Sequence, residues 1–362
     1  MIYLDNAATT IDKSFMFCPV VDGHSVWDGN PHSIHRYGIE AKKVIEEAEK
    51  TFKEFINGWD GQFFWTGSGS QANSLAIRTV CESHTLVTTA IEHKSILQHI
   101  DTYVRSNLIP PNQQGQIQPF PIPDWTDMVS VQFINNETGI INPIKAISDS
   151  LDRDKTYFHT DAVQAFGKIP IDVDKLGIDL MTFSSHKCHG PKGLGGLWVR
   201  NRVLKDKTRG RFKYLGTPPV ELIDRLASVV ENIDTLKHQR YVIEIENMFL
   251  STLMGQRTKH LFTLSPKYRI SGLISLHIPG VDSTDLVFEL SEQGVYISSG
   301  SACDNGKVGP SHVLTAMGIS KKRAEETIRV SFSHLNTIRE VQTAAQIMAS
   351  TIERIRNGPK SP

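Results

Sequence analysis

The sequence predicts an α/β protein whose large domain is a mostly parallel sheet flanked by helices, with a smaller α+β domain beside it. Three observations support this prediction. The chain has 362 residues, 39% of them hydrophobic and 22% charged, which suits a folded protein with one large and one smaller domain. Strand-like and helix-like segments alternate through the first part of the chain, a pattern typical of parallel sheets covered on both faces. The alternation breaks after Thr217-Pro218-Pro219.

The alternating part begins with an amphipathic helix predicted over 36–56. Its apolar residues Ala41, Ile45, Ala48 and Phe52 recur every three to four positions, with Lys and Glu between them. The strands that follow are predicted at 62–65, 85–89, 129–134, 157–159, 180–183 and 196–199. The helices between them are predicted at 71–81, 94–105 and 143–151.

The second part opens with one long helix predicted over 220–254, a stretch with few helix-breaking residues. Strands are then predicted at 273–278, 295–298 and 327–332, and helices at 283–293 and 338–355. This order of elements is of the α+β type. We therefore assign residues 12–235 to the large domain, and residues 1–11 together with 236–362 to the small one.

Composition and termini exclude several classes of protein. The formal net charge of zero argues against a surface that coats nucleic acid. The first residues have neither a basic start nor an apolar core, and no run of about 18 apolar residues exists, so we expect no signal peptide and no membrane span. No two of the four cysteines form a Cys-x-x-Cys pair, which favours free thiols in a cytoplasmic setting.

The tetrapeptide Ser184-Ser185-His186-Lys187 ends a predicted strand and precedes a glycine-rich stretch. A lysine in this position can condense with an aldehyde cofactor, and its small hydroxyl-bearing neighbours can bind a phosphate. The combination points to pyridoxal phosphate, abbreviated PLP. The alternative is a surface lysine next to a flexible loop.

Other polar residues follow the predicted strands, where ligands bind in open α/β sheets. Gly69 and Ser70 lie in a Gly/Ser loop that runs into a helix, an arrangement suited to phosphate or to a simple N-cap. His93 could stack on a flat ring, move protons, or merely start a helix. Asp161 could pair with a protonated ring nitrogen or cap the next helix, and Gln164 or Asn136 could bind a ring oxygen.

Cys303 lies in a small, polar, glycine-containing segment, so its thiol is a candidate nucleophile, with a passive surface cysteine as the alternative. His186, Cys188 and His189 suggest a metal site only weakly. No second ligand pair stands at a zinc-site spacing, and ligands so close in sequence rarely converge on one ion. We therefore expect no metal.

Taken together, these motifs resemble the cysteine desulfurases, within the class V (fold-type I) superfamily of PLP-dependent transaminases. The resemblance covers essentially the whole chain. Its blocks, in order, are Tyr3–Thr10, Gly29–Ser33, Thr66–Ala76, Glu92–Lys94, Asn135–Gly139, His159–Gln164, Ser184–Lys187, Ser298–Cys303 and Ile328–Ser331.

The resemblance implies a role for each matching residue. Lys187 would bind the cofactor aldehyde and later move protons, and His93 would stack on the ring. Asp161 would pair with the ring nitrogen, and Gln164 would contact the ring oxygen. The phosphate would be bound by Gly69, Ser70, Ser184 and His186, joined by Thr217 from the partner subunit of a homodimer. Asn136 and Arg329 would bind the substrate carboxylate.

The implied activity is the conversion of L-cysteine to L-alanine, with Cys303 taking the sulfur as a persulfide for transfer to a protein acceptor. A selenocysteine lyase and a catalytically weak subunit that recruits partners remain as alternatives. Tyr214 replaces an arginine usual in the family, the segment before Thr217 is shorter, and the chain stops soon after its last predicted helix. These departures suggest a specialised member of the family with its own sulfur acceptor, either in an iron–sulfur pathway or in the sulfuration of tRNA or DNA. We expect no direct binding of nucleic acid.

Overall fold

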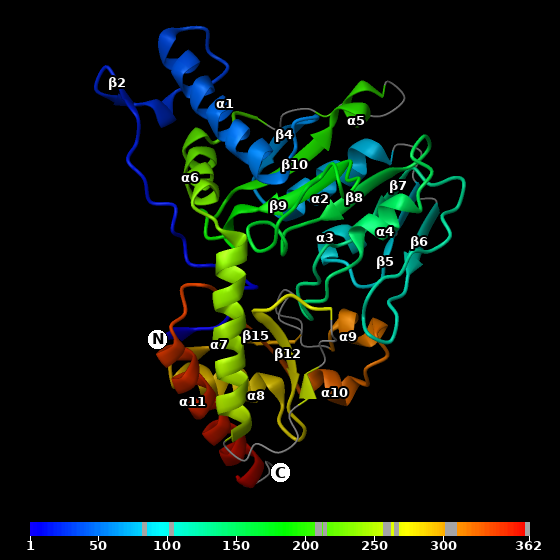
Figure 1. Cartoon of the computed structure of the whole chain (residues 1–362), viewed down its shortest axis with the longest axis vertical. Coiled ribbons are helices and arrows are strands. Elements are labelled where there is room, and N and C mark those ends of the chain that lie inside the picture. The colour runs from blue at the N-terminus through cyan, green and yellow to red at the C-terminus, as the bar shows by residue number, and fades with distance from the viewer. Residues whose placement is uncertain are drawn as a thin grey trace.

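The computed structural model describes residues 1–81, 85–100, 105–206, 212, 216–255, 262–263, 268–300 and 310–358. Two bodies are visible, one around each of two sheets, with the long helix α7 (Thr235–Gly255) running from one to the other (Figure 1). Both chain ends lie in the body that contains the smaller sheet (Figure 1). No helix within the described ranges is both long and apolar enough to cross a membrane.

Within the described residues, seven strands form the larger sheet in the order β4-β10-β9-β8-β7-β5-β6. Only β10 runs antiparallel to its neighbours, which confirms the mostly parallel sheet. The bounds are β4 (Gly61–Thr66), β5 (Thr85–Thr89), β6 (Arg105–Ile109), β7 (Met128–Ser130), β8 (Tyr157–Asp161), β9 (Leu180–Ser184) and β10 (Gly195–Arg200).

Helices cover both faces of this sheet because successive strand residues point to opposite sides. Phe63, Val87 and Phe158 pack in one core with α1, α4 and α6. Phe64 and Leu86 pack in another with α2, α3 and α5. These helices are α1 (Arg36–Ile56), α2 (Gly69–Val80), α3 (Lys94–Leu97), α4 (Ile144–Asp149), α5 (Asn201–Lys205) and α6 (Val220–Glu231).

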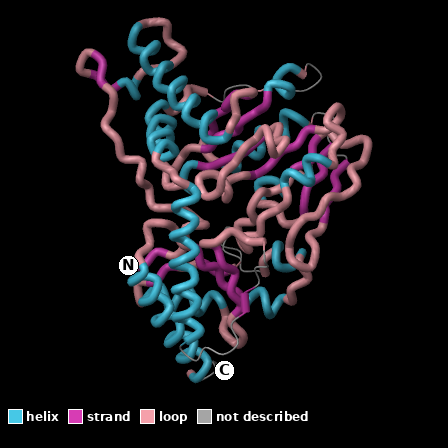
Figure 2. The backbone as a smooth tube through the Cα atoms, in the orientation of Figure 1, coloured by secondary structure: helices cyan, strands magenta, loops and turns pink. Residues whose placement is uncertain are grey.

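The smaller sheet joins four strands of the described chain in the order β11-β12-β15-β14. Its core packs against α7, α8 and α11, and buried Leu4 of the N-terminal segment belongs to it. Figure 2 shows these strands enclosed by helices at the end of the molecule opposite the larger sheet. The strands are β11 (Phe262–Thr263), β12 (Leu273–His277), β14 (Ser298–Ser299) and β15 (Thr327–Ser331), and the helices are α8 (Ser283–Glu292), α9 (His312–Ala316), α10 (Lys321–Glu325) and α11 (Ile338–Asn357).

Short elements complete the chain. Strand β1 pairs in parallel with β13, and β2 pairs with β3. The bounds are β1 (Ile2–Tyr3), β2 (Val20–Val21), β3 (His24–Ser25), β13 (Val295–Tyr296) and the 3-10 helices η1 (Val26–Asp28) and η3 (Ser185–Lys187).

Three predictions of local structure were wrong. Among the described residues of the helix predicted over 94–105, the α-helix covers Lys94–Leu97, and Arg105–Ile109 forms β6, paired with the buried β5. The strand predicted over 129–134 is regular only at Met128–Ser130. Val131 N and Phe133 N still donate to His159 O and Asp161 O of β8, and the chain then turns where Asn135 Oδ1 accepts from the N–H groups of Glu137 and Thr138.

The third error is the single helix over 220–254, which is two helices. Helix α6 ends at Glu231 and α7 starts at Thr235. The reason lies in the three residues between them, where the Asp234 side chain accepts a hydrogen bond from Lys237 N at 2.9 Å. An Asp in this position satisfies a free N–H of a new first turn, so it favours a fresh helix start over continuation.

An ion pair between Glu246 and Arg269 links α7 to the segment before β12. The Glu246 carboxylate accepts bonds from both Arg269 Nη atoms and from Gly272 N at 2.6 Å, and Glu246 is 4% exposed. We expect Glu246→Ala to lower the free energy of unfolding by about 3 kcal/mol, because it leaves the half-buried Arg269 guanidinium without its carboxylate partner. Urea denaturation measures this.

The control is Glu244→Ala, which removes an exposed carboxylate from the same helix. It should change the free energy of unfolding by no more than about 0.5 kcal/mol. Equal effects of the two substitutions would contradict the importance of the ion pair.

Candidate functional site

A pocket of about 690 Å³, part of it open to solvent, lies where the loops after β4, β5, β8 and β9 meet. This is the edge at which ligands bind in open α/β sheets. Nine sequence-predicted site residues line it, namely Gly69, Ser70, His93, Asn136, Asp161, Gln164, Ser184, His186 and Lys187. The structure therefore brings together side chains that are spread over more than a hundred positions of the sequence.

The N-terminus of α2 forms one wall of the pocket. Ser68 caps the helix, its side chain accepting from Gln71 N at 3.2 Å, and Ser68, Gly69 and Ser70 all line the pocket. Neighbouring Gly195 has to be glycine, because a Cβ there would lie 2.2 Å from the backbone carbon of Ser68. A helix N-terminus presents N–H groups and a partial positive charge, which suits an anion.

Ser184 faces the same wall from the end of β9. It is 3% exposed, and among the described residues its Oγ has no hydrogen-bond partner. A buried hydroxyl is rarely left without a partner. An anion at the start of α2 would supply one, so the helix N-terminus and the serine together fit a phosphate group.

Asp161 carries the buried carboxylate of the site. It is 2% exposed, and its two oxygens accept from Asn73 Nδ2 at 2.8 Å and Val163 N at 2.9 Å. These donors are neutral, so the negative charge itself is not compensated by them. A cationic ring nitrogen in the pocket would compensate it.

Asn73 extends this network to His93. The Asn73 Nδ2 group also donates to Ser95 Oγ at 2.9 Å, and Ser95 Oγ lies 2.8 Å from His93 Nδ1. Because Ser95 N also donates to His93 Nδ1, at 3.1 Å, this nitrogen is an acceptor and the ring proton resides on Nε2. Burial lowers the pKa of His93, so the imidazole is neutral near pH 7.

Lys187 meets the N-terminal segment of the chain. Its Nζ donates to Ala7 O at 2.6 Å and to Ala8 O at 2.7 Å, and Gln164 Nε2 donates to Ala7 O at 2.9 Å. Both side chains also line the pocket. The carbonyl groups therefore hold the amine at the edge of the site.

Arg329 lies behind Asn136 rather than in the lining. The guanidinium is 2% exposed and donates to Asn136 O at 3.0 Å, to Asp5 Oδ1 at 3.0 Å and to Ser298 Oγ at 3.1 Å. Among the described residues, its buried Nε has no partner. It is therefore tied to the pocket through the backbone of Asn136.

Besides Arg329, two further predicted site residues are not among the described lining residues. Thr217 is exposed and absent from the lining, and its contribution to a partner subunit stays a prediction. Cys303 lies outside the described residues.

The sequence reasoning missed Asn73, Ser95 and Gln132, which also line the pocket. A signal existed for the first two. Asn73 lies in the first turn of the helix predicted over 71–81, next to the Gly/Ser loop that contains Ser70, and Ser95 follows His93 by two positions. Gln132 lies in the stretch wrongly predicted as strand, where no pattern marks it.

Glu92 is fully buried and contacts the pocket-lining residue Gln132. Its Oε1 accepts from Thr89 Oγ1 and from Gln132 N, both at 2.8 Å. Burial raises the pKa of Glu92 to about 8, so the carboxyl group is protonated at neutral pH. It therefore joins the end of β5 to the loop of Gln132 without adding a charge.

The comparisons with known proteins match the chain over nearly its full length. A family model described as "Aminotransferase class-V" matches residues 2–212 and 208–343. The chain is 34% identical to the "Putative cysteine desulfurase IscS 1" of Bacillus subtilis (strain 168), over 98% of the chain and 99% of that relative. It is 29% identical to the "Cysteine desulfurase IscS" of Methanosarcina thermophila, over 100% of the chain and 94% of that relative.

Solved structures with a similar fold also match the chain over most of its length. A "NifS-like protein" superimposes with a TM-score of 0.83 at 26% identity, covering 97% of this chain and 99% of that one. The structure titled "SspA in complex with cysteine" gives a TM-score of 0.77 at 26% identity, covering 93% of this chain and 100% of that one.

The pH dependence of stability tests the environment of Glu92. Its folded pKa of about 8 lies above the ordinary pKa of 4.5 for a glutamate, so folding takes up a proton between these values and stability falls as pH rises through that window. Glu92→Gln keeps the shape and one acceptor but cannot ionise. We expect the stability of the unmodified protein, relative to Glu92→Gln, to fall by about 3 kcal/mol between about pH 5.5 and 8.

Urea denaturation of both proteins across this range makes the measurement. A difference in unfolding free energy that stays constant with pH would contradict a protonated Glu92.

Proposed function

The chain belongs to the class V aminotransferase family, as a PLP-dependent enzyme of its cysteine desulfurase group, and we propose that it converts L-cysteine to L-alanine and retains the sulfur on Cys303. The observation that carries this proposal is the network joining Asp161, Asn73, Ser95 and His93 around a pocket that ends at Lys187. One site thus holds a carboxylate that can pair with the ring nitrogen of PLP, a neutral imidazole that can stack on the PLP ring, and a lysine amine.

PLP, when bound, withdraws electrons from the α-carbon of an amino acid and so makes its proton acidic. Lys187 would hold it covalently, with Asp161 at the ring nitrogen, Gln164 at the ring oxygen and His93 over the ring. The phosphate would lie at the start of α2, against Gly69, Ser70, Ser184 and His186. Thr217 of a second copy in a homodimer would complete that contact.

The substrate is positioned by its carboxylate. We assign this task to Asn136, which lines the pocket, and to Arg329 behind it, whose Nη1 donates to Asn136 O and whose buried Nε has no partner among the described residues. The Lys187 amine then takes the α-proton of cysteine and later returns a proton. His93, with its proton on Nε2, orients the site and moves protons near the substrate.

Sulfur transfer requires a thiolate. The Cys303 sulfur attacks the sulfur of the bound cysteine, the S–S bond forms, and the bond between that sulfur and the β-carbon breaks. The electron pair of the broken bond goes to the β-carbon, which is then protonated, so alanine leaves. The persulfide on Cys303 balances the reaction without an external oxidant.

The wider setting is proposed from the family. We assign residues 12–235 to the cofactor-binding domain, and residues 1–11 with 236–362 to a small domain carrying Cys303. The protein would act in the cytoplasm and pass its sulfur to a protein acceptor in iron–sulfur, tRNA or DNA sulfuration. Trapping the acceptor on the Cys303 persulfide would identify the pathway.

Cys303→Ser tests the sulfur step. We expect alanine formation from L-cysteine to fall at least about 100-fold, because the attacking sulfur is lost. Cofactor absorbance should remain. Cys18→Ser, which removes a half-buried thiol near β3, is the matched control and should retain activity.

Alanine is quantified by chromatography and sulfide by a colorimetric assay. Full activity in Cys303→Ser would contradict the proposal. Persistent release of selenide from selenocysteine by this variant would instead indicate a selenocysteine lyase.

Asp161→Asn tests the role of the buried charge. The substitution keeps the size of the side chain but removes the carboxylate, so we expect alanine release to fall at least about 100-fold, the scale of a lost charge-stabilising group. The exposed Asp154→Asn serves as control and should stay within about twofold. Equal rates for both variants would mean that Asp161 does not act on the cofactor.

A further inference from the structure

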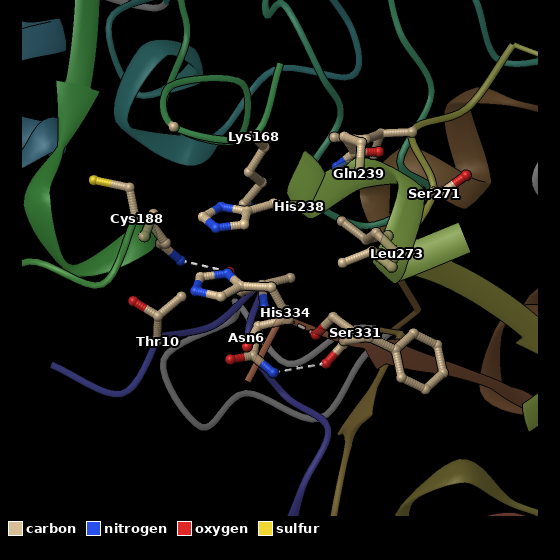
Figure 3. A pocket seen from close by; sticks show the side chains of 18 of the residues that line it. Asn6, Thr10, Lys168, Cys188, His238, Gln239, Ser271, Leu273, Ser331 and His334 are labelled. Atoms are coloured by element: carbon tan, nitrogen blue, oxygen red, sulfur yellow. Dashed lines mark hydrogen bonds between the residues drawn. The ribbon is translucent and has the colours of Figure 1, made fainter. Parts of the chain in front are cut away.

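A second pocket, shown in Figure 3, lies next to the first, and the proposed reaction does not use its remaining lining residues. It encloses about 580 Å³, part of it open to solvent. Its walls come from the larger-sheet body at Lys168 and His189, from α7 at His238, and from the smaller-sheet body at Phe332 and His334. Lys187 and Ala7 border both pockets, so the two sites share a wall.

Basic side chains, without acidic ones among the described residues, line this second pocket. Two lysines and three histidines line it, and among its described lining residues none is Asp or Glu. The exposed carboxylate of Asp234, which is not part of the lining, favours the protonated form of His238 and so raises its pKa. In a folded protein, clustered basic groups without a carboxylate mark a place where an anion from solution is favoured.

The three histidines are in ring contact. His238 and His334 are stacked with their centroids 3.8 Å apart and planes at 3°, and His189 meets His334 edge-on at 4.9 Å. Figure 3 shows the stacked pair facing each other beneath Lys168. His189 Nδ1 lies 2.9 Å from Ile11 O, which must accept its proton, so Nε2 is the remaining nitrogen of that ring.

Burial lowers the pKa of all three histidines, that of His334 to about 4. Neighbouring basic groups lower these pKa values further. Asp234 partly offsets the lowering of the His238 pKa. The bond to Ile11 O partly offsets the lowering of the His189 pKa. They are therefore neutral near pH 7 in the absence of a counterion. An anion beside them would offset the repulsion and favour their protonated forms.

Lys168 supplies the positive charge at neutral pH. Its Nζ donates to Gln164 Oε1 at 2.5 Å, and burial lowers the pKa of Lys168 to about 7. Gln164 in turn bonds to Ala7 O, which also accepts from Lys187. Gln164 and Ala7 therefore link Lys168 to Lys187 through hydrogen bonds, and an anion at Lys168 would be connected to the reaction site by this chain.

The rest of the lining is apolar. Val242, Leu273 and Phe332 form the wall next to the imidazole rings. An inorganic ion would leave this surface unused. A metal ion is not favoured, because the described residues contain no cluster of three or more side chains that could bind one.

We propose that this pocket binds a small organic carboxylate, its charge at Lys168 and the histidines and its apolar part against Val242, Leu273 and Phe332. The site is distinct from the substrate site, which uses Asn136 and Arg329. Its occupant would act on the reaction through the shared wall of Ala7, Gln164 and Lys187.

The test measures binding of benzoate to the holoenzyme by titration calorimetry, with L-alanine at saturating concentration to fill the substrate site. We expect one benzoate per chain, with benzamide and inorganic phosphate each binding at least about tenfold more weakly. Affinity for benzoate should rise as pH falls from about 8 to 6, because Lys168, with a pKa of about 7, gains a proton in this range.

Variants locate the site. His334→Ala and, independently, His238→Gln should weaken benzoate binding at least about tenfold and leave cysteine turnover within about twofold. His24→Ala, an exposed histidine on β3, is the control and should change neither. The proposal is overturned if benzoate and benzamide bind equally, if phosphate matches benzoate, if alanine displaces benzoate, or if both pocket variants bind benzoate as the unmodified protein does.

Discussion

The site depends on one buried carboxylate and the amide that holds it. Asp161 is 2% exposed at the end of β8, and Asn73 on α2 donates to it. The same amide group also fixes Ser95 and, through it, the tautomer of His93. One hydrogen-bonded unit thus sets the distance between a strand, a helix and the ring that faces the pocket, and its uncompensated negative charge determines what that pocket favours.

The N-terminal segment connects this unit to the rest of the molecule. Asp5 pairs with Arg329 and bridges to Ser331, while the carbonyls of Ala7 and Ala8 accept from Lys187. A few residues therefore contact both sheets and both pockets. Ala7 lines both pockets and its carbonyl accepts from Lys187, so a shift of this segment would move the lysine amine, which gives the second pocket a physical route to the first.

Much of this arrangement could be predicted from the sequence, for local reasons. The helix at 36–56 has the bounds that its apolar spacing predicts, and the residues after the strands meet because parallel strands end at one edge. The pairing of β6 with β5 and the helix start at Asp234 depend on tertiary contacts or on one cap, and the spacing of apolar residues does not show them. The Asp5–Arg329 pair and the stack of His238 on His334 join distant positions, so no local pattern marks them.

The central claim is that Lys187, rather than another amine, binds the cofactor. Lys168 is the natural rival, since its pKa is lowered to about 7 and it lines the adjacent pocket. Borohydride reduction of the purified holoenzyme, followed by peptide mass spectrometry, fixes the cofactor to whichever lysine holds it. The account predicts the label on Lys187 alone; a label on Lys168, or no labelled lysine, would contradict it.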